Sequence, residues 1–87
     1  MILIDPPTWP GWGRHWSHVV SDASLEELHD FAERISLPRR LFDEDHYDLP
    51  EERYEEAVAA GAREVSGREL IRALIASGLR VRQAERR

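Results

Sequence analysis

The sequence predicts a single α/β domain in which three helices pack on a small, mostly parallel sheet of three or four strands. The chain has 87 residues, which suits one domain. Helix signals alternate along it with short apolar runs, as in parallel sheets whose crossovers are helices. Cysteine is absent, which excludes disulfides and Cys-bound zinc. We expect the domain to span residues 1–79 and a basic, disordered tail to span 80–87.

Short apolar runs mark the expected strands. Residues 2–4 are Ile-Leu-Ile and are followed by Asp5 and two prolines, which is typical of a strand buried on both faces. Residues 8–17 hold three Trp, two Gly and a Pro, which predicts a long loop. Further strands are expected at residues 18–21, 39–42, 62–65 and 79–81.

Capping signals mark the three helices. Ser24 and Glu27 have the spacing of a capping box, and the same spacing recurs further along the chain. The second box is formed by Ser66 and Glu69. Pro50 is placed for the first turn of the helix between them. The three helices are expected to end at Pro38, Gly61 and Gly78.

The charge distribution limits the partners. The formal net charge is −5, with an acidic body and arginines gathered near the C-terminus. An acidic body is not expected to bind extended duplex nucleic acid, which requires the neutralisation of many phosphates. No apolar run approaches the length of a membrane span, and the first residues lack the basic start of a signal peptide. We therefore expect a cytoplasmic protein without a membrane partner, with homodimer formation as a remedy for the thin stability margin of a small domain.

Histidine and aspartate carry the expected chemistry. Imidazole and carboxylate together suit zinc or manganese, and three protein ligands with an open position make a catalytic site. The candidate ligands are Asp5, His18 and His46. Asp5 follows a buried strand, where an unpaired carboxylate is costly. The structural alternatives are a cap on the proline turn for Asp5 and a hydrogen-bonded loop anchor for His46.

The acidic run at residues 43–48 has a structural interpretation as well. Asp48 lies just before the second helix and is placed to cap it. Asp43 and Asp45 are expected in a solvated loop. His29 falls one step off the apolar face of the first helix, so a boundary position is the alternative to a catalytic role.

Tryptophans and arginines form a second candidate site. Trp12 lies in the Trp-rich loop close to Arg14, and aromatic rings beside a guanidinium stack bases and hold phosphates. Arg39 and Arg40 are further phosphate-binding candidates. The alternative is that the tryptophans seal the open side of a small core.

The order of several short groups of residues resembles a known family. These groups are Ile4-Asp5, Gly13-Arg14, His18, Ser21-Asp22, Glu27-Leu28-His29, Arg39-Arg40, His46-Tyr47-Asp48, Gly61-Ala62 and Ser66-x-Arg68. The combination of these groups resembles the small bacterial and phage family called domain of unknown function 4031 (DUF4031). The resemblance covers nearly the whole chain, to about Gly78. The resemblance implies no reaction, but it implies that the polar residues form a family pattern. The site residues expected on this ground are Asp5, His18, Asp22, His29, His46 and Asp48.

Two classes of function follow from these residues. The first is a metal-dependent hydrolase or nuclease-like enzyme that acts on a phosphate-containing substrate, with Asp22, Asp48 and His29 as catalytic candidates. The second is a non-catalytic module that binds a small molecule, nucleotide, RNA or protein through residues 9–16. A third interpretation, a polar network that only stabilises a thin core, stays open.

Overall fold

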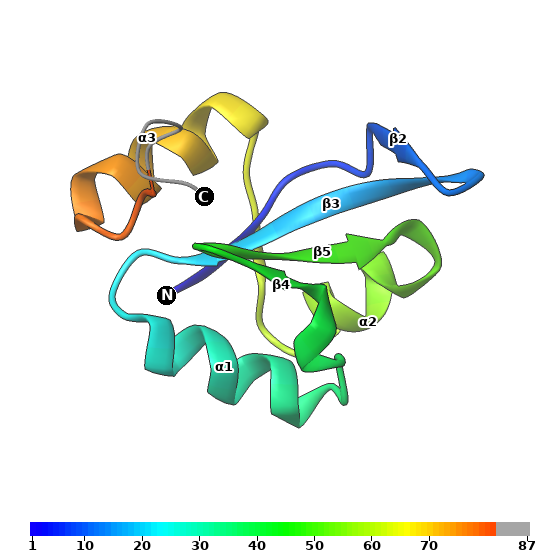
Figure 1. The fold of residues 1–87 in the computed structure, drawn as a ribbon, viewed down its shortest axis with the longest axis horizontal. Coiled ribbons are helices and arrows are strands. Elements are labelled where there is room, and N and C mark those ends of the chain that lie inside the picture. Colours follow the sequence, from blue (N-terminus) through cyan, green and yellow to red (C-terminus); the bar gives the residue numbers. More distant parts are fainter. Residues whose placement is uncertain (82–87) are drawn as a thin grey trace.

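The longest strand organises the sheet. The structure is a computed structural model that describes residues 1–81, and its ribbon is drawn in Figure 1. Strand β3 pairs along one edge with β1 and β2 and along the other with β5, while β4 and β6 extend the sheet at its two sides. The strands are β1 (Ile2–Ile4), β2 (Trp9–Gly11), β3 (Arg14–Ser21), β4 (Phe42–Asp43), β5 (His46–Pro50) and β6 (Arg63–Glu64).

The sheet is mixed and mostly antiparallel. Of the strand pairs in residues 1–81, one, β1–β6, is parallel. The prediction of a mostly parallel sheet is therefore wrong, while the α/β class with three helices is confirmed. The chain reverses through tight hairpins where crossovers were expected. Trp12 and Gly13, with φ of 54° and 76°, form a two-residue turn between β2 and β3, inside the region predicted as a loop.

The minor strand predictions also change. Residues 39–42 form a 3-10 helix, η1 (Arg39–Leu41), and only Phe42 enters a strand, because the Leu41 N–H closes a turn onto the Pro38 carbonyl. The strand predicted at residues 62–65 shortens to β6. Residues 79–81 form no strand.

Two helices begin where their capping signals predict. Helix α1 (Leu25–Arg34) follows Ser24, and α3 (Gly67–Ser77) follows a complete capping box and ends at Gly78 with φ of 82°. The box of α1 is only half formed. The Glu27 carboxylate instead accepts from the amino terminus of Met1 at 2.7 Å and from a serine hydroxyl.

The second helix begins later than Pro50 predicts. Pro50 is the last residue of β5, and a 3-10 turn, η2 (Glu51–Arg53), comes before α2 (Tyr54–Ala59). Asp48 therefore lies in the middle of a strand, and its predicted role as a helix cap is wrong. Its side chain therefore lies on the sheet and not at a helix terminus.

Side-chain alternation divides the core into two layers. Val19 and Tyr47 face α1 and α2, whereas Val20 and Leu3 face α3. The ribbon in Figure 1 shows α3 on one side of the sheet and α1 and α2 on the other. Helix α3 packs over the end of β3 that contains Val20. Within residues 1–81, the helices leave the rest of that sheet face uncovered. None of the helices in residues 1–81 is long and apolar enough to cross a membrane.

Candidate functional site

Three potential metal ligands converge on the sheet face that α3 leaves open. His18 on β3 lies opposite Asp48 on β5, and His46 precedes Asp48 by two residues on the same strand. Because side chains alternate along a strand, all three point to one face. One ligand atom from each lies within 4.8 Å of the others. We call these three residues the His-Asp cluster.

A buried carboxylate fixes the His18 ring. Asp5, the residue after β1, is 3% exposed. Its Oδ2 lies 2.9 Å from Nδ1 of His18, and its Oδ1 accepts the His18 backbone N–H at 2.6 Å. One carboxylate thus holds both the ring and the backbone of this histidine. Since Nδ1 is occupied, Nε2 is the ring nitrogen left for a ligand.

A second buried carboxylate fixes the His46 ring. The Asp45 side chain is fully buried, so its prediction as part of a solvated loop is wrong. Its Oδ1 lies 2.7 Å from Nδ1 of His46, and its Oδ2 accepts the backbone N–H of Val81 at 2.8 Å. The Arg80 guanidinium lies 3.6 Å from the same oxygen. Two residues of the predicted tail thus contact this carboxylate, and the remainder of that tail, 82–87, lies outside the described residues.

His46 lies between two carboxylates. Its Nε2 is 3.2 Å from Oδ1 of Asp48, on the side opposite Asp45. Burial lowers the pKa of His46, but the hydrogen bonds with Asp48 and Asp45 outweigh this effect, and the net pKa is raised above its usual value. The surroundings of this ring therefore favour a positive charge, which a proton or a bound cation supplies.

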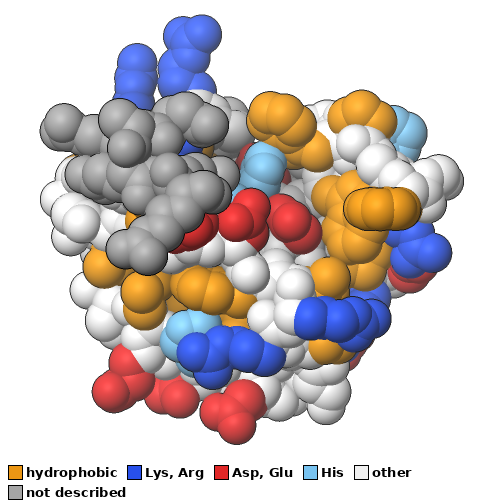
Figure 2. All heavy atoms as spheres, viewed as in Figure 1, with side chains coloured by type: hydrophobic (Ala, Val, Ile, Leu, Met, Phe, Trp, Pro, Cys, Tyr) orange, Lys and Arg blue, Asp and Glu red, His pale blue; other side chains and the backbone are white. Residues whose placement is uncertain are grey.

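A groove of about 560 Å³ runs from the His-Asp cluster along the Trp-rich hairpin. One wall is the β2–β3 hairpin with its three tryptophans, and residues 40–43 line the other side. The Trp9 ring meets the His18 ring edge to face, with centroids 4.9 Å apart. Figure 2 shows histidine and acidic side chains near the centre of this face, with hydrophobic side chains next to them. The volume is typical of small-molecule sites.

Four of the predicted site residues lie away from the cluster, and two of them, Asp22 and Arg14, form ion pairs elsewhere on the surface. Asp22 is exposed and pairs with the amino terminus of Met1 at 2.8 Å. Arg14 pairs with Glu52 at 2.6 Å, at the surface. Trp12 and Arg40, in contrast, line the groove together with His18 and Asp48.

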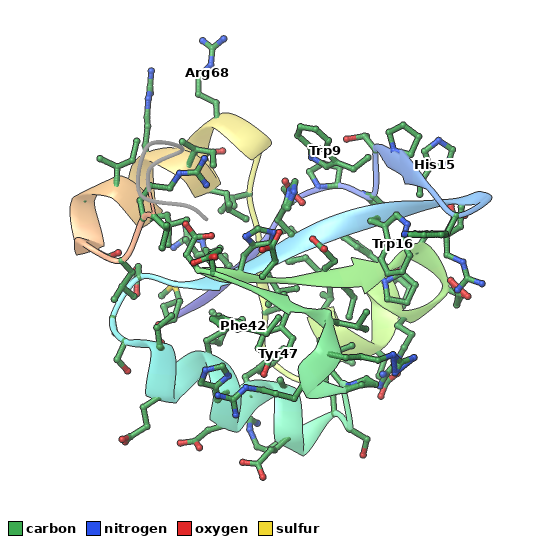
Figure 3. All side chains as sticks on the ribbon, viewed as in Figure 1. Trp9, His15, Trp16, Phe42, Tyr47 and Arg68 are labelled. Atoms are coloured by element: carbon green, nitrogen blue, oxygen red, sulfur yellow. The ribbon has the colours of Figure 1, made fainter. Side chains whose placement is uncertain are left out.

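His29 and Arg39 form a separate group on the α1 side of the sheet. Nδ1 of His29 is hydrogen-bonded to the Tyr47 hydroxyl at 2.8 Å, and its ring meets Phe42 with centroids 4.6 Å apart. Figure 3 shows Phe42 and Tyr47 on this side, away from Trp9. The Arg39 guanidinium lies 5.9 Å from the Phe42 ring centre. Burial, followed by the charge of Arg39, lowers the pKa of His29.

The strand that carries two of the three cluster residues was not predicted from the sequence. His46 and Asp48 alternate with the apolar Tyr47 and Leu49, which is the pattern of a half-buried strand. That signal was available, but the acidic residues before it indicated a loop. Asp45 gives no such signal, because its burial depends on residues far along the chain.

The comparisons with known proteins agree with the resemblance seen in the sequence. The sequence profile of the family described as "Protein of unknown function (DUF4031)" matches residues 2–77. The chain belongs to this family. No curated protein and no solved structure matches it. The function of this DUF4031 chain is therefore inferred from the geometry of its His-Asp cluster.

The double contact of Asp5 predicts a large effect of its removal on stability. Asp5→Ala leaves the His18 backbone N–H without its partner, so we expect the free energy of unfolding to fall by about 1–3 kcal/mol. The matched control is Asp22→Ala, which removes an exposed ion pair and should cost under about 1 kcal/mol. Urea denaturation at neutral pH measures both. Equal effects of the two substitutions would contradict the described contacts.

The surroundings of His29 predict a pH dependence. Because its folded pKa is below the ordinary 6.5, the unfolded chain takes up a proton that the folded chain resists. The stability that neutral His29 contributes is therefore present above pH 6.5 and is lost as the pH falls below it. NMR titration should place His29 below 6.5, and Arg39→Gln should raise its pKa. A His29 pKa above the ordinary value would count against this environment.

Proposed function

We propose that this DUF4031 chain is a metal-dependent hydrolase that cleaves a phosphate ester. The ion, zinc or manganese, is held by Nε2 of His18, Nε2 of His46 and a carboxylate oxygen of Asp48. The observation that carries the proposal is the pair of buried carboxylates, Asp5 and Asp45, each bound to the Nδ1 of one of two imidazoles that meet at one point.

The outer carboxylates support a metal because they perform a known task in metal sites. A carboxylate on the far nitrogen of a ligating histidine fixes the tautomer and orientation of the ring and raises its basicity. Tetrahedral zinc, with bonds of about 2.0–2.2 Å, holds its ligand atoms roughly 3.4 Å apart. The ligand atoms of the His-Asp cluster lie within 4.8 Å of one another, so modest side-chain rotation closes the site.

Asp5 and Asp48 have roles in this site that differ from those expected from the sequence. Asp5 was expected as a ligand and Asp48 as an orienting group or base. The Asp5 carboxylate is engaged by the ring and backbone of His18, whereas Asp48 faces Nε2 of His46. We therefore assign Asp48 to the ion and Asp5 to the orientation of His18.

Three protein ligands suit hydrolysis because they leave a position for water and a substrate oxygen. The bound ion lowers the pKa of a water and polarises the phosphoryl group. In the reaction the water oxygen bonds to phosphorus, the ester P–O bond breaks, and the departing oxygen takes the proton that the water gives up. Asp43 on β4 lies opposite His46 on β5 in the strand register, and it lines the groove together with Asp48. This position suits it to accept the proton of the water.

Arg40 favours a phosphate over an uncharged substrate. It lies in η1 and lines the same groove as His18 and Asp48. A guanidinium binds two phosphate oxygens in a fixed fork, while the ion takes a third. The Arg14 guanidinium is already paired with Glu52, so we do not assign it to the phosphate.

Metal binding by untagged protein tests the proposal. We expect one zinc or manganese per chain by elemental analysis and calorimetry, and metal-dependent hydrolysis of p-nitrophenyl phosphate esters. His46→Gln and Asp48→Asn should each weaken metal binding at least about tenfold, since each removes one of three ligands. The matched control is His15→Gln, because His15 is an exposed histidine outside the His-Asp cluster.

The result separates a metal site from a structural polar network. A structural network predicts that His46→Gln lowers the melting temperature and that no ion binds in stoichiometric amount. Equal metal binding by His46→Gln and His15→Gln would overturn the proposal. Circular dichroism of Asp48→Asn, whose side chain is half-exposed, shows whether the fold persists when the ligand is removed.

A further inference from the structure

The tip of the β2–β3 hairpin holds an unfavourable residue. Trp12 is 93% exposed and has a φ of 54°. A two-residue turn with positive φ at both positions is best formed by Asn-Gly, Asp-Gly or Gly-Gly, because bulky side chains are strained there. A large apolar ring in water adds no compensating burial. The free protein gains no burial energy from this side chain. We therefore expect the Trp12 ring to contribute in a complex with a bound molecule.

The surroundings of Trp12 indicate which molecule that is. Trp12 lines the groove with Trp9 and Trp16, while Arg40 lies in the 3-10 helix that borders it. The hairpin register sets Trp9 directly opposite Trp16. Flat aromatic side chains next to a guanidinium fit a ligand that combines a planar ring with a phosphate.

We propose that the groove binds a nucleotide unit, with the base stacked on the tryptophans of the hairpin and the phosphate between Arg40 and the His-Asp cluster. This inference rests on the proposed function, because the metal ion is the second anchor of the phosphate. It names the substrate class of that site. The unit comes either from a free mononucleotide or from a single-stranded nucleic acid, since both present the same base and phosphate.

The shape of this sheet face is compatible with both sources. Two further hollows share Trp9 and His18 with the groove, and one of them reaches Arg68 and Arg72 of α3. Figure 3 shows Arg68 on the α3 side and Trp9 on the hairpin side of this face. A single strand would therefore pass the His-Asp cluster with arginines at both sides, whereas a mononucleotide would fill the groove alone.

Tryptophan fluorescence with four probes tests the inference. Metal-loaded, untagged protein is titrated with adenosine 5′-monophosphate, adenosine, ribose 5-phosphate and hexa-adenylate. We expect the mononucleotide to quench the fluorescence and to bind at least about tenfold more tightly than adenosine or ribose 5-phosphate, because each of these lacks one anchor. Tighter binding of hexa-adenylate identifies a single strand as the source, and equal binding identifies the mononucleotide.

Two variants connect the binding to the groove. Trp12→Asn should weaken mononucleotide binding at least about fivefold and raise Tm by roughly 2 °C or more, because Asn accepts positive φ. A gain in stability together with a loss of binding excludes misfolding as the cause. Arg40→Gln should weaken binding of both phosphate probes and leave adenosine unchanged. Its matched control is Arg34→Gln, in the last turn of α1 on the other side of the sheet.

The outcomes separate this inference from the proposed function. If metal binds and p-nitrophenyl phosphate is hydrolysed, but ribose 5-phosphate binds as well as the mononucleotide, the nucleotide inference is overturned and the hydrolase proposal stands. If no metal binds and the mononucleotide still binds in a Trp12-dependent way, the hydrolase proposal fails and base stacking stands. Unchanged mononucleotide binding in Trp12→Asn overturns the inference in either case.

Discussion

The antiparallel pairing of β3 with β5 is the constraint on which the site depends. It sets His18 opposite Asp48, and the alternation of side chains then brings His46 to the same face. A shift of β5 by one residue in this register would turn His46 and Asp48 towards the α1 layer, on the face opposite to His18. The register is held by Val19 and Tyr47, which are paired across the same two strands and are both buried in that layer.

Buried carboxylates make the site costly to build. Taking a carboxylate out of water is unfavourable unless charged or hydrogen-bonded partners replace the water. Asp5 is compensated by the ring and backbone of His18, and Asp45 by His46, Arg80 and the Val81 N–H. In a chain of 87 residues the stability margin is thin. In the proposed function, these two carboxylates orient the rings of His18 and His46 towards a cation.

The sequence was sufficient for some elements and insufficient for others. Ser66, Glu69 and Gly78 predicted α3 because capping is encoded within a few residues. The antiparallel sheet was missed because its first hairpin turns at Trp12-Gly13, which lacks the usual Asn-Gly signal. Among the site residues, Asp5, His18, His46 and Asp48 were all named from the sequence. Their grouping depends on strand register, and the burial of Asp45 depends on Arg80 and Val81. Neither can be predicted from neighbouring residues in the sequence, because both depend on contacts between distant segments.

In the proposed site, two carboxylate-oriented imidazoles present Nε2 to one metal ion. Long-range ¹H–¹⁵N NMR of the protein with and without zinc tests it most directly, because it assigns the proton and the metal on each ring nitrogen. We expect zinc on Nε2 of His18 and His46, a retained proton on both Nδ1 atoms, and unchanged rings for His15 and His29. Zinc on an Nδ1 atom, or a response confined to the other two histidines, would contradict it.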